Sequence, residues 1–366
     1  MSYQPKPGTH YLELDTPALL LDLDAFQHNL NTMAQFFANK PTSLRPHAKT
    51  HKCPEIARRQ IQAGAIGITC AKVGEAEVLA RAGIEDILIA NQIVGEFKIA
   101  RLTDLAAHAE LMVAVDDPAN ITALSRACQA KGVSLRVLVE VDIGMNRCGA
   151  QPGMPALGLA QQVADSPNLQ LAGLMGYEGH LVSIVDPEER RARVLQALVP
   201  LQETRDLLEE NGLPVEIVSG GGTGTYDVSG TYPPMTEIEA GSYVLMDASY
   251  IAVRPEFETA LTILSSVISR PTPERVVTDA GMKTVTTDHG LPVPIEIPGA
   301  SVRRLSEEHG LLELADPRAV QPRPGDKIRL IPGHCCTNVN LYDNLHVVQD
   351  GTLVDIWPVA ARGRAQ

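Results

Sequence analysis

The chain has 366 residues, more than an ordinary single domain, so we expect one large domain and a smaller one. Its hydrophobic content of 44% is enough for a full core, and its net charge of −13 argues against a nucleic-acid-binding surface. No stretch approaches the roughly 20 apolar residues of a membrane span, and no secretion signal is visible. The six cysteines form no disulfide framework, so we expect reduced thiols and a cytoplasmic location.

Short apolar runs alternate with segments of helical periodicity through the first two thirds of the chain. The periodicity predicts helices at 53–63, 74–82, 118–131 and 188–212. Strands are expected at 18–22, 66–70, 86–90, 111–115, 135–142, 171–177, 215–219 and 236–239, and in a run that ends at Lys49. Strands in strict alternation with helices are typical of an α/β fold, the (β/α)8 TIM barrel. A doubly wound sheet is the alternative.

The pattern changes after about residue 250. Strands are expected at 261–269, 275–279, 327–331 and 345–348, with turns rich in Pro and Gly between them and almost no helix. This predicts a second, mainly β C-terminal domain. We therefore place the barrel at 15–248 and the β domain at 249–366, and expect residues 1–14 to pack on the β domain.

A basic segment runs from Arg45 to Lys52 at the expected end of a strand. Side chains alternate along a strand, so Arg45, His47 and Lys49 are expected to share one face. A lysine crowded by cations and partly desolvated has a lowered pKa, which favours the neutral amine that attacks aldehydes. Lys49 is therefore a candidate Schiff-base lysine, and a solvated basic strand end is the alternative.

Two glycine-rich loops and an arginine turn also follow predicted strands, where barrel active sites collect. The loop at 219–226 reads Ser-Gly-Gly-Gly-Thr-Gly-Thr-Tyr, and its bare backbone amides can hold a phosphate. It matches neither common nucleotide-binding glycine motif. Gly241 and Ser242, in the second loop, could add further donors. Arg147 lies in a turn flanked by glycines at the end of another strand.

His334 and Cys336 are two residues apart. If this segment is extended, both side chains project from one face, as two ligands of a divalent metal would. A structural role is the alternative for such a pair.

Motifs in one order along nearly the whole chain resemble those of the D-threonine aldolase and D-serine dehydratase family of pyridoxal 5'-phosphate (PLP) enzymes, which has the alanine racemase fold. They lie at 15–22, 45–49, 141–144, 147–149, 219–224, 241–243, 246–247, 279–281, 308–310 and 333–334. The resemblance implies that Lys49 is the Schiff-base lysine and that Arg147 contacts the cofactor's phenolate oxygen. It implies a divalent metal, Zn or Mn, on His334 and Cys336.

The resemblance also supplies the remaining site residues. The two loops would hold the phosphate through Gly221, Gly222, Thr223, Gly241 and Ser242. By analogy with alanine racemase, Glu239 would face the pyridine nitrogen. Three further residues are expected in the catalytic set around Lys49, namely His47, Tyr177 and His180. The aldolases carry a histidine a few residues after this tyrosine, near the metal, and here it is displaced, so either His180 substitutes as a base or the substrate differs.

The expected reaction is retro-aldol cleavage of a β-hydroxy-D-amino acid to glycine and an aldehyde, in a homodimer. Residues 337–343 resemble the aldolases, whereas Cys336 is the residue found in D-serine dehydratase-like members. The first alternative is therefore β-elimination from D-serine or D-hydroxyaspartate to a keto acid. The two remaining candidates are an amino-acid racemase and a cofactor-carrying protein without turnover.

Overall fold

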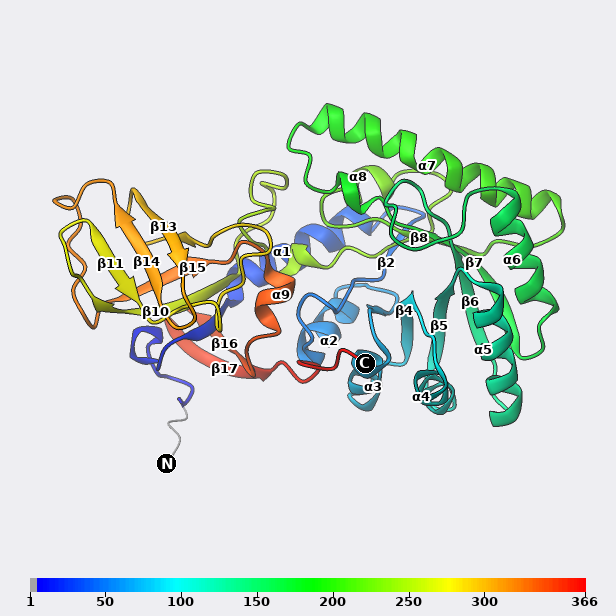
Figure 1. The fold of residues 1–366 in the computed structure, drawn as a ribbon, viewed down its shortest axis with the longest axis horizontal. Helices are drawn as coiled ribbons and strands as arrows, with labels where there is room; N and C mark the ends of the chain where they lie inside the picture. Colours follow the sequence, from blue (N-terminus) through cyan, green and yellow to red (C-terminus); the bar gives the residue numbers. More distant parts are fainter. Residues whose placement is uncertain (1–4) are drawn as a thin grey trace. The chain divides into compact units, whose positions relative to one another are not determined.

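A computed structural model of the chain describes residues 5–366 and divides into two compact units (Figure 1). We call residues 33–49, 54–241 and 363–366 the barrel unit, and residues 1–32, 50–53 and 242–362 the β unit. The expectation for residues 1–4, part of the segment 1–14, lies outside the described residues. Among residues 5–366, no helix has the length and hydropathy that crossing a membrane requires.

The barrel unit holds eight parallel strands in the order β2-β9-β8-β7-β6-β5-β4-β3. The strands are β2 (Ser43–Leu44), β3 (Ile68–Cys70), β4 (Asp86–Gln92), β5 (Glu110–Val115), β6 (Leu135–Glu140), β7 (Leu169–Gly176), β8 (Ile217–Gly220) and β9 (Glu237–Ile238). His47, just after β2, forms a parallel bridge with Thr69 of β3, and Ala48 N–H donates to the Thr69 carbonyl at 2.8 Å. These contacts join the two ends of the sheet, and the predicted barrel is confirmed.

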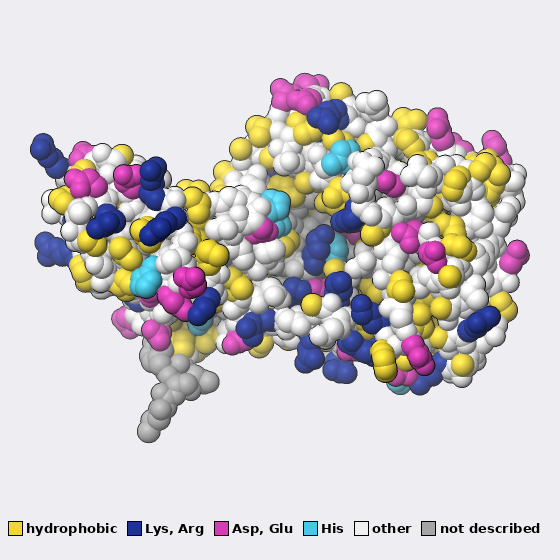
Figure 2. Space-filling view, in the orientation of Figure 1, with side chains coloured by type: hydrophobic (Ala, Val, Ile, Leu, Met, Phe, Trp, Pro, Cys, Tyr) yellow, Lys and Arg dark blue, Asp and Glu magenta, His cyan; other side chains and the backbone are white. Residues whose placement is uncertain are grey.

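Helices follow the barrel strands in sequence. They are α2 (Pro54–Gln62), α3 (Val73–Arg81), α4 (Glu96–Ala106), α5 (Pro118–Lys131), α6 (Met154–Asp165), α7 (Pro187–Glu210) and α8 (Tyr226–Ser229). Caps and charge define several ends: Asp117 accepts hydrogen bonds from the first turn of α5, and Gly132 ends that helix in a left-handed conformation. Figure 2 shows acidic side chains over the start of α7. Glu188 and Glu189 lie in the first turn of this helix, where their negative charge interacts favourably with the helix dipole.

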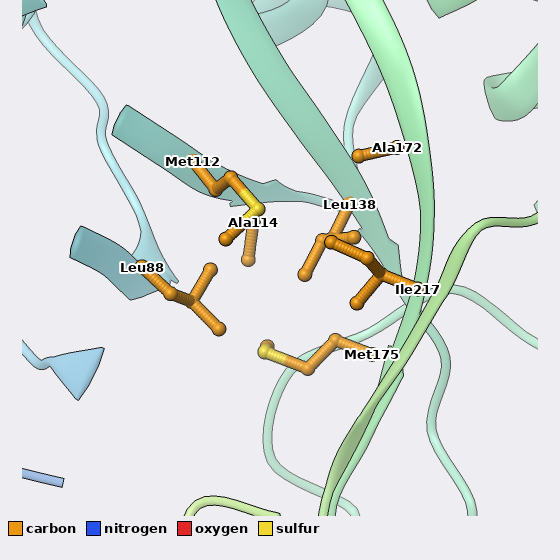
Figure 3. Close-up of a cluster of buried hydrophobic side chains, with 7 residues drawn as sticks. All are labelled: Leu88, Met112, Ala114, Leu138, Ala172, Met175 and Ile217. Carbon is orange, nitrogen blue, oxygen red and sulfur yellow. The ribbon is translucent and has the colours of Figure 1, made fainter. Parts of the chain in front are cut away.

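Apolar side chains from five neighbouring strands fill the barrel interior (Figure 3). They point toward one another and are Leu88, Met112, Ala114, Leu138, Ala172, Met175 and Ile217. Leu88, Ala114, Leu138 and Ala172 have no exposed surface. Burying a side chain as large as leucine contributes about 1.5–3 kcal/mol, so this packing holds the strand ends that carry the site.

The β unit contains a mostly antiparallel nine-stranded sheet. Its strands are β1 (Ala18–Asp22), β10 (Leu261–Ser269), β11 (Arg275–Thr278), β12 (Val293–Pro294), β13 (Ala300–Leu305), β14 (Gly310–Leu314), β15 (Lys327–Ile331), β16 (Asn344–Gln349) and β17 (Thr352–Pro358). The predicted mainly β domain is confirmed. The N-terminal segment also pairs here, since His10 bridges Thr352 and Gly8 N–H donates to the Leu353 carbonyl at 2.8 Å.

The assignment of residues 18–22 to the barrel was wrong. Strand β1 pairs with β10 and β16 in the nine-stranded sheet. The first four residues of β1 are apolar and buried. A continuous apolar run is also the sequence pattern of a barrel strand, which explains the error. Helix α1 (Leu23–Phe37) then continues the chain, and the boundaries 15–248 and 249–366 remain a prediction.

Candidate active site

Lys49 lies in a turn directly after the bridge that closes the barrel. The His47 ring accepts a hydrogen bond at Nδ1 from the Lys49 backbone N–H at 3.4 Å, which ties the turn to the closing strand segment. Lys49 Nζ lies 5.8 Å from the centre of the Tyr177 ring, which follows β7. The turn therefore directs the amine toward the carboxyl ends of the strands, where the sequence predicts the site.

The expected crowding of Lys49 by Arg45 was wrong. Strand β2 ends at Leu44, so the strict alternation of side chains does not extend to Lys49. The Arg45 guanidinium is buried and paired, with Nε 2.9 Å from Glu237 Oε2 and Nη1 2.6 Å from Asp86 Oδ1. Burial lowers the pKa of Arg45, but the two carboxylates outweigh it and raise that pKa. Arg45 stabilises the barrel closure and supplies no unpaired charge to Lys49.

Arg147 is held in a structured loop after β6. Asp142 Oδ1 accepts the backbone N–H groups of Gly144 and Asn146, each at 3.0 Å, which shapes the turn before the arginine. The guanidinium carbon lies 5.7 Å from the centre of the Tyr177 ring, and Nη2 lies 3.9 Å from Glu140 Oε1. Tyr177 thus has both Arg147 and the Lys49 amine near its ring, which brings two predicted site residues together.

The first glycine loop is packed on the segment that carries Tyr177. Added Cβ atoms would lie 3.2 Å from Tyr177 Oη at Gly222 and 1.9 Å from the Val182 carbonyl at Gly224. The second contact is shorter than any side chain tolerates, so position 224 requires glycine. Gly221 has φ +73° and Thr223 is buried. A tight turn with glycines at three of its four positions brings backbone amides together without side chains over them, which fits a phosphate monoester.

Glu239 lies at the end of β9 and is hydrogen-bonded within the barrel unit. Ser219 Oγ donates to Glu239 Oε1 at 2.8 Å. Burial raises the pKa of Glu239 to about 7, against the lowering effects of the Ser219 hydroxyl and of the Lys49 charge. Glu239 is half-buried and hydrogen-bonded to Ser219, so it is not a fully solvated carboxylate. A carboxyl group that titrates near neutrality suits a partner that itself changes protonation, such as a pyridine nitrogen.

His180 lies beside the turn that leads to Arg147. It is exposed, in the short helix η2 (Gly179–Leu181), and lines a cavity of about 460 Å³ with Asp142 and Arg193. Neither Lys49 nor Tyr177 contributes to the described lining of this cavity. The structure thus places His47 and Tyr177 beside Lys49 and places Arg147 beside Tyr177, whereas His180 has no described contact with any of them.

Three side chains with atoms that can ligate a metal come together in the β unit. The ligand atoms of His334, Cys335 and Cys336 lie within 4.8 Å of one another. The expectation of an extended segment was wrong, because His334 is the N-cap of helix α9 (Cys335–Val339). The helical turn brings all three side chains to one place, whereas an extended strand would have directed Cys335 to the opposite face.

A buried carboxylate orients the histidine of this cluster. Asp247 Oδ2 lies 2.9 Å from His334 Nδ1 and accepts the Cys335 N–H at the same distance. A proton on Nδ1 leaves Nε2 for a metal, the usual arrangement of a metal-bound histidine. Burial lowers the pKa of His334, but Asp247 and the Cys336 sulfur outweigh it and raise that pKa to about 10. The cluster favours positive charge, and its nitrogen and sulfur donors fit a zinc-like ion.

Two hydroxyl groups contact the Cys336 sulfur. Thr50 Oγ1 lies 3.2 Å from Sγ and Ser242 Oγ lies 3.7 Å from it. Ser242, a predicted phosphate ligand, thus lies beside the group formed by His334, Cys335 and Cys336. It belongs to the β unit, whereas Gly241 belongs to the barrel unit. Thr50 is fully buried and follows Lys49 directly in the chain.

Comparisons with known proteins agree with this geometry. Residues 21–249 match the family model of the alanine racemase N-terminal domain, and residues 260–348 match that of a putative serine dehydratase domain. The chain is 41% identical to D-threonine aldolase of Arthrobacter sp., over 98% of this chain and 95% of that protein. The chain belongs to the D-threonine aldolase and D-serine dehydratase family. The resemblance predicted from the motifs is confirmed.

Solved structures of this family superpose closely on the chain. D-threonine aldolase from Filomicrobium marinum has a TM-score of 0.97 and 43% identity, and the match covers 99% of this chain and all of that one. A cysteine-to-alanine mutant of D-threo-3-hydroxyaspartate dehydratase, described as the metal-free form, has a TM-score of 0.85 and 26% identity over 96% of this chain and 98% of that one. The family therefore contains both aldolases and dehydratases, which are lyases.

Sequence reasoning missed four residues of the two sites. Asp247 and Cys335 join the metal cluster, and Glu140 and Glu178 lie behind Arg147 and the glycine loop. Position 178 directly follows Tyr177, and position 140 ends a predicted strand, so both could have been suspected as polar residues after barrel strands. Their partners could not be read from sequence, because the contacts join distant segments.

Proposed function

We propose that this protein is a lyase that uses PLP and a divalent metal to cleave β-hydroxy-D-amino acids of the D-threonine type to glycine and an aldehyde. The observation that carries the proposal is the His334 cluster with Asp247 on its Nδ1. A racemase needs a second base and no metal, so a built metal site favours chemistry at a β-hydroxyl group.

The residues around Lys49 suit PLP, which when bound supplies an electron sink for the charge left on the substrate's α-carbon. Lys49 Nζ would attach the cofactor, and the Arg147 guanidinium would orient it at its phenolate oxygen. Tyr177 would support both, since both lie within 6 Å of its ring centre. The hydrogen-bonded Glu239 carboxyl would face the ring nitrogen.

The phosphate would be held by the amides of Gly221 and Thr223, with Gly241 as a second source of donors. Gly222, whose own N–H donates to Thr225 Oγ1 at 3.1 Å, would let the phosphate approach the backbone closely. His47, through its contact with the Lys49 N–H, would keep the amine-bearing turn in place. His180 stays the proposed base that accepts the β-hydroxyl proton.

A metal on His334 Nε2 and Cys336 Sγ would leave positions open for the substrate hydroxyl and water. A bound divalent ion lowers the pKa of a coordinated hydroxyl group, so its proton leaves at neutral pH and the carbon–carbon bond can break. The two hydroxyl contacts of Cys336 would fix the sulfur. Zn is favoured by this donor set, and Mn is the alternative.

The second candidate function is β-elimination. It is favoured by the Cys336 ligand, because a softer, more strongly bound ion can also activate the hydroxyl group as a leaving group. Ammonia and a 2-keto acid would then be formed.

One assay separates these reactions. The full-length protein with PLP is incubated with D-threonine, D-phenylserine, D-serine and D-3-hydroxyaspartate, with and without Mn²⁺ or Zn²⁺. We expect glycine and the matching aldehyde from D-threonine and D-phenylserine, and only with metal. A keto acid as the main product would establish elimination, and interconversion of enantiomers without metal would establish a racemase. A homodimer and a cytoplasmic location complete the proposal; the six free cysteines support the second.

A further inference from the structure

Glu178 is a fully buried carboxyl group that the proposed chemistry does not use. It directly follows Tyr177 and has no exposed surface. Its Oε1 atom accepts two short hydrogen bonds, from Thr225 Oγ1 at 2.6 Å and from Ser229 Oγ at 2.5 Å. Its Oε2 atom is buried and has no hydrogen-bond partner among the described residues.

The unpartnered oxygen makes a purely stabilising role a poor explanation. A buried polar atom without a partner costs about 1–3 kcal/mol, and such atoms in a native fold require a reason. The two hydroxyl partners connect Glu178 to the segment after the glycine loop, because Thr225 is the N-cap of α8 and Ser229 is its last residue.

The Thr225 hydroxyl connects Glu178 to the loop itself. A hydroxyl group has one proton to donate, and Thr225 Oγ1 lies 2.6 Å from the Glu178 carboxyl but 3.5 Å from the Gly222 carbonyl. With its proton directed to Glu178, Thr225 Oγ1 is free to accept the Gly222 N–H at 3.1 Å. Glu178 thereby sets the direction of the bond between Thr225 and Gly222.

The loop also contacts the segment that begins at Glu178. Gly222 lies against the Tyr177 ring and Gly224 against the Val182 carbonyl, so both sides of the loop meet residues 177–182. If the Glu178 carboxyl group were removed, Thr225 could rotate and donate to the Gly222 carbonyl instead. The Gly222 peptide group would lose its fixed orientation.

We propose that Glu178 is the positioning residue of the phosphate-binding loop, and that it acts through Thr225 to make the site selective for a phosphate monoester. The inference rests on the proposed function, because it assumes that the loop receives the phosphate of PLP. The inference goes beyond the proposed function because it names a buried acid, Glu178, that is not among the site residues predicted from the sequence. This acid would determine how strongly the phosphate is held.

The test compares two cofactors that differ only in the phosphate. The full-length protein is stripped with hydroxylamine, and Kd is measured for PLP and for pyridoxal by absorbance and by quenching of protein fluorescence. For Glu178→Met we expect the Kd of PLP to rise about ten- to a hundred-fold, or about 1.4–2.8 kcal/mol, while the Kd of pyridoxal stays within about two-fold. Glu178→Gln, which keeps an acceptor oxygen, should recover most of the PLP affinity.

Two controls complete the design. Glu189→Met, an exposed acid on α7, should leave both Kd values unchanged. If Glu178→Met does not fold, as judged by its thermal transition, Thr225→Val breaks the same connection at one hydroxyl, and Thr225→Ser should restore it. An equal loss of affinity for both cofactors, or an unchanged Kd for PLP, would overturn the inference. If the wild-type protein does not prefer PLP to pyridoxal, the proposed cofactor site itself is wrong.

Discussion

The replacement Glu239→Gln tests the electrostatics of the barrel site without any cofactor. Burial raises the pKa of Glu239 to about 7, from an ordinary value of 4.5. The folded state therefore favours the protonated carboxyl group. The stability that the protonated Glu239 contributes is complete below about pH 4.5 and is lost as the pH rises through about 7. At 1.36 kcal/mol per pKa unit, the charged form costs about 3 kcal/mol at about pH 8.

Glutamine has no charge to desolvate, and its oxygen can still accept from Ser219. We therefore expect cofactor-free Glu239→Gln to be more stable than wild type by up to about 3 kcal/mol at about pH 8, and by less than about 1 kcal/mol at about pH 5. For a chain of this size that is about 4 °C in Tm at the higher pH. The gain should approach zero as the pH falls.

Thermal unfolding followed by circular dichroism at both pH values measures this difference. Glu210→Gln, at the exposed end of α7, is the matched control and should show no pH-dependent gain. A gain for Glu239→Gln of equal size at both pH values, or no gain at about pH 8, would refute the argument that this carboxyl group is desolvated. In the PLP-loaded enzyme the same change should lower turnover with little effect on substrate binding.

Three further predictions concern Lys49 and the metal cluster. Borohydride reduction of the holoenzyme should fix the cofactor on Lys49, as read by peptide mass spectrometry, and a label on Lys52 would contradict the assignment. EDTA should abolish turnover while the thermal transition stays within about 2 °C, because hydrogen bonds to Asp247 hold His334 and Cys335 in place; a large fall in Tm would indicate a structural metal. Thr50→Val should weaken Co²⁺ binding about ten-fold and shift the Co–thiolate absorption band, whereas Thr50→Ser should leave both unchanged, since the hydroxyl group contacts Cys336. Identical spectra for the two variants would show that the hydroxyl has no effect.

Much of the fold was predictable because apolar runs and helical periodicity alternate clearly from 66 to 220. The errors occur where the local sequence pattern does not distinguish between the alternatives. Residues 18–22 are as apolar as a barrel strand, so only their pairing with β10 and β16 shows which sheet they join. Strands β2 and β9 have two residues each, too few for any period to appear.

The candidate site was predictable where family motifs name the residue and less so where tertiary contacts decide. Lys49 and Arg147 both lie near the Tyr177 ring, and their roles stay predictions. The pairing of Arg45 with Glu237 and Asp86 removes the electrostatic reason first given for Lys49. The buried acids were not predicted, because burial depends on segments far apart in sequence.

The central claim is that this protein breaks a carbon–carbon bond, and the reverse reaction tests it most directly. An aldolase must also join glycine to acetaldehyde, whereas a dehydratase with the same groups has no route to that bond. The PLP- and metal-loaded enzyme is incubated with glycine and excess acetaldehyde, and the products are resolved by chiral chromatography. We expect D-threonine and D-allothreonine, without the L-enantiomers, in the presence of metal only. No β-hydroxy amino acid from a preparation that converts D-serine to pyruvate would contradict the account.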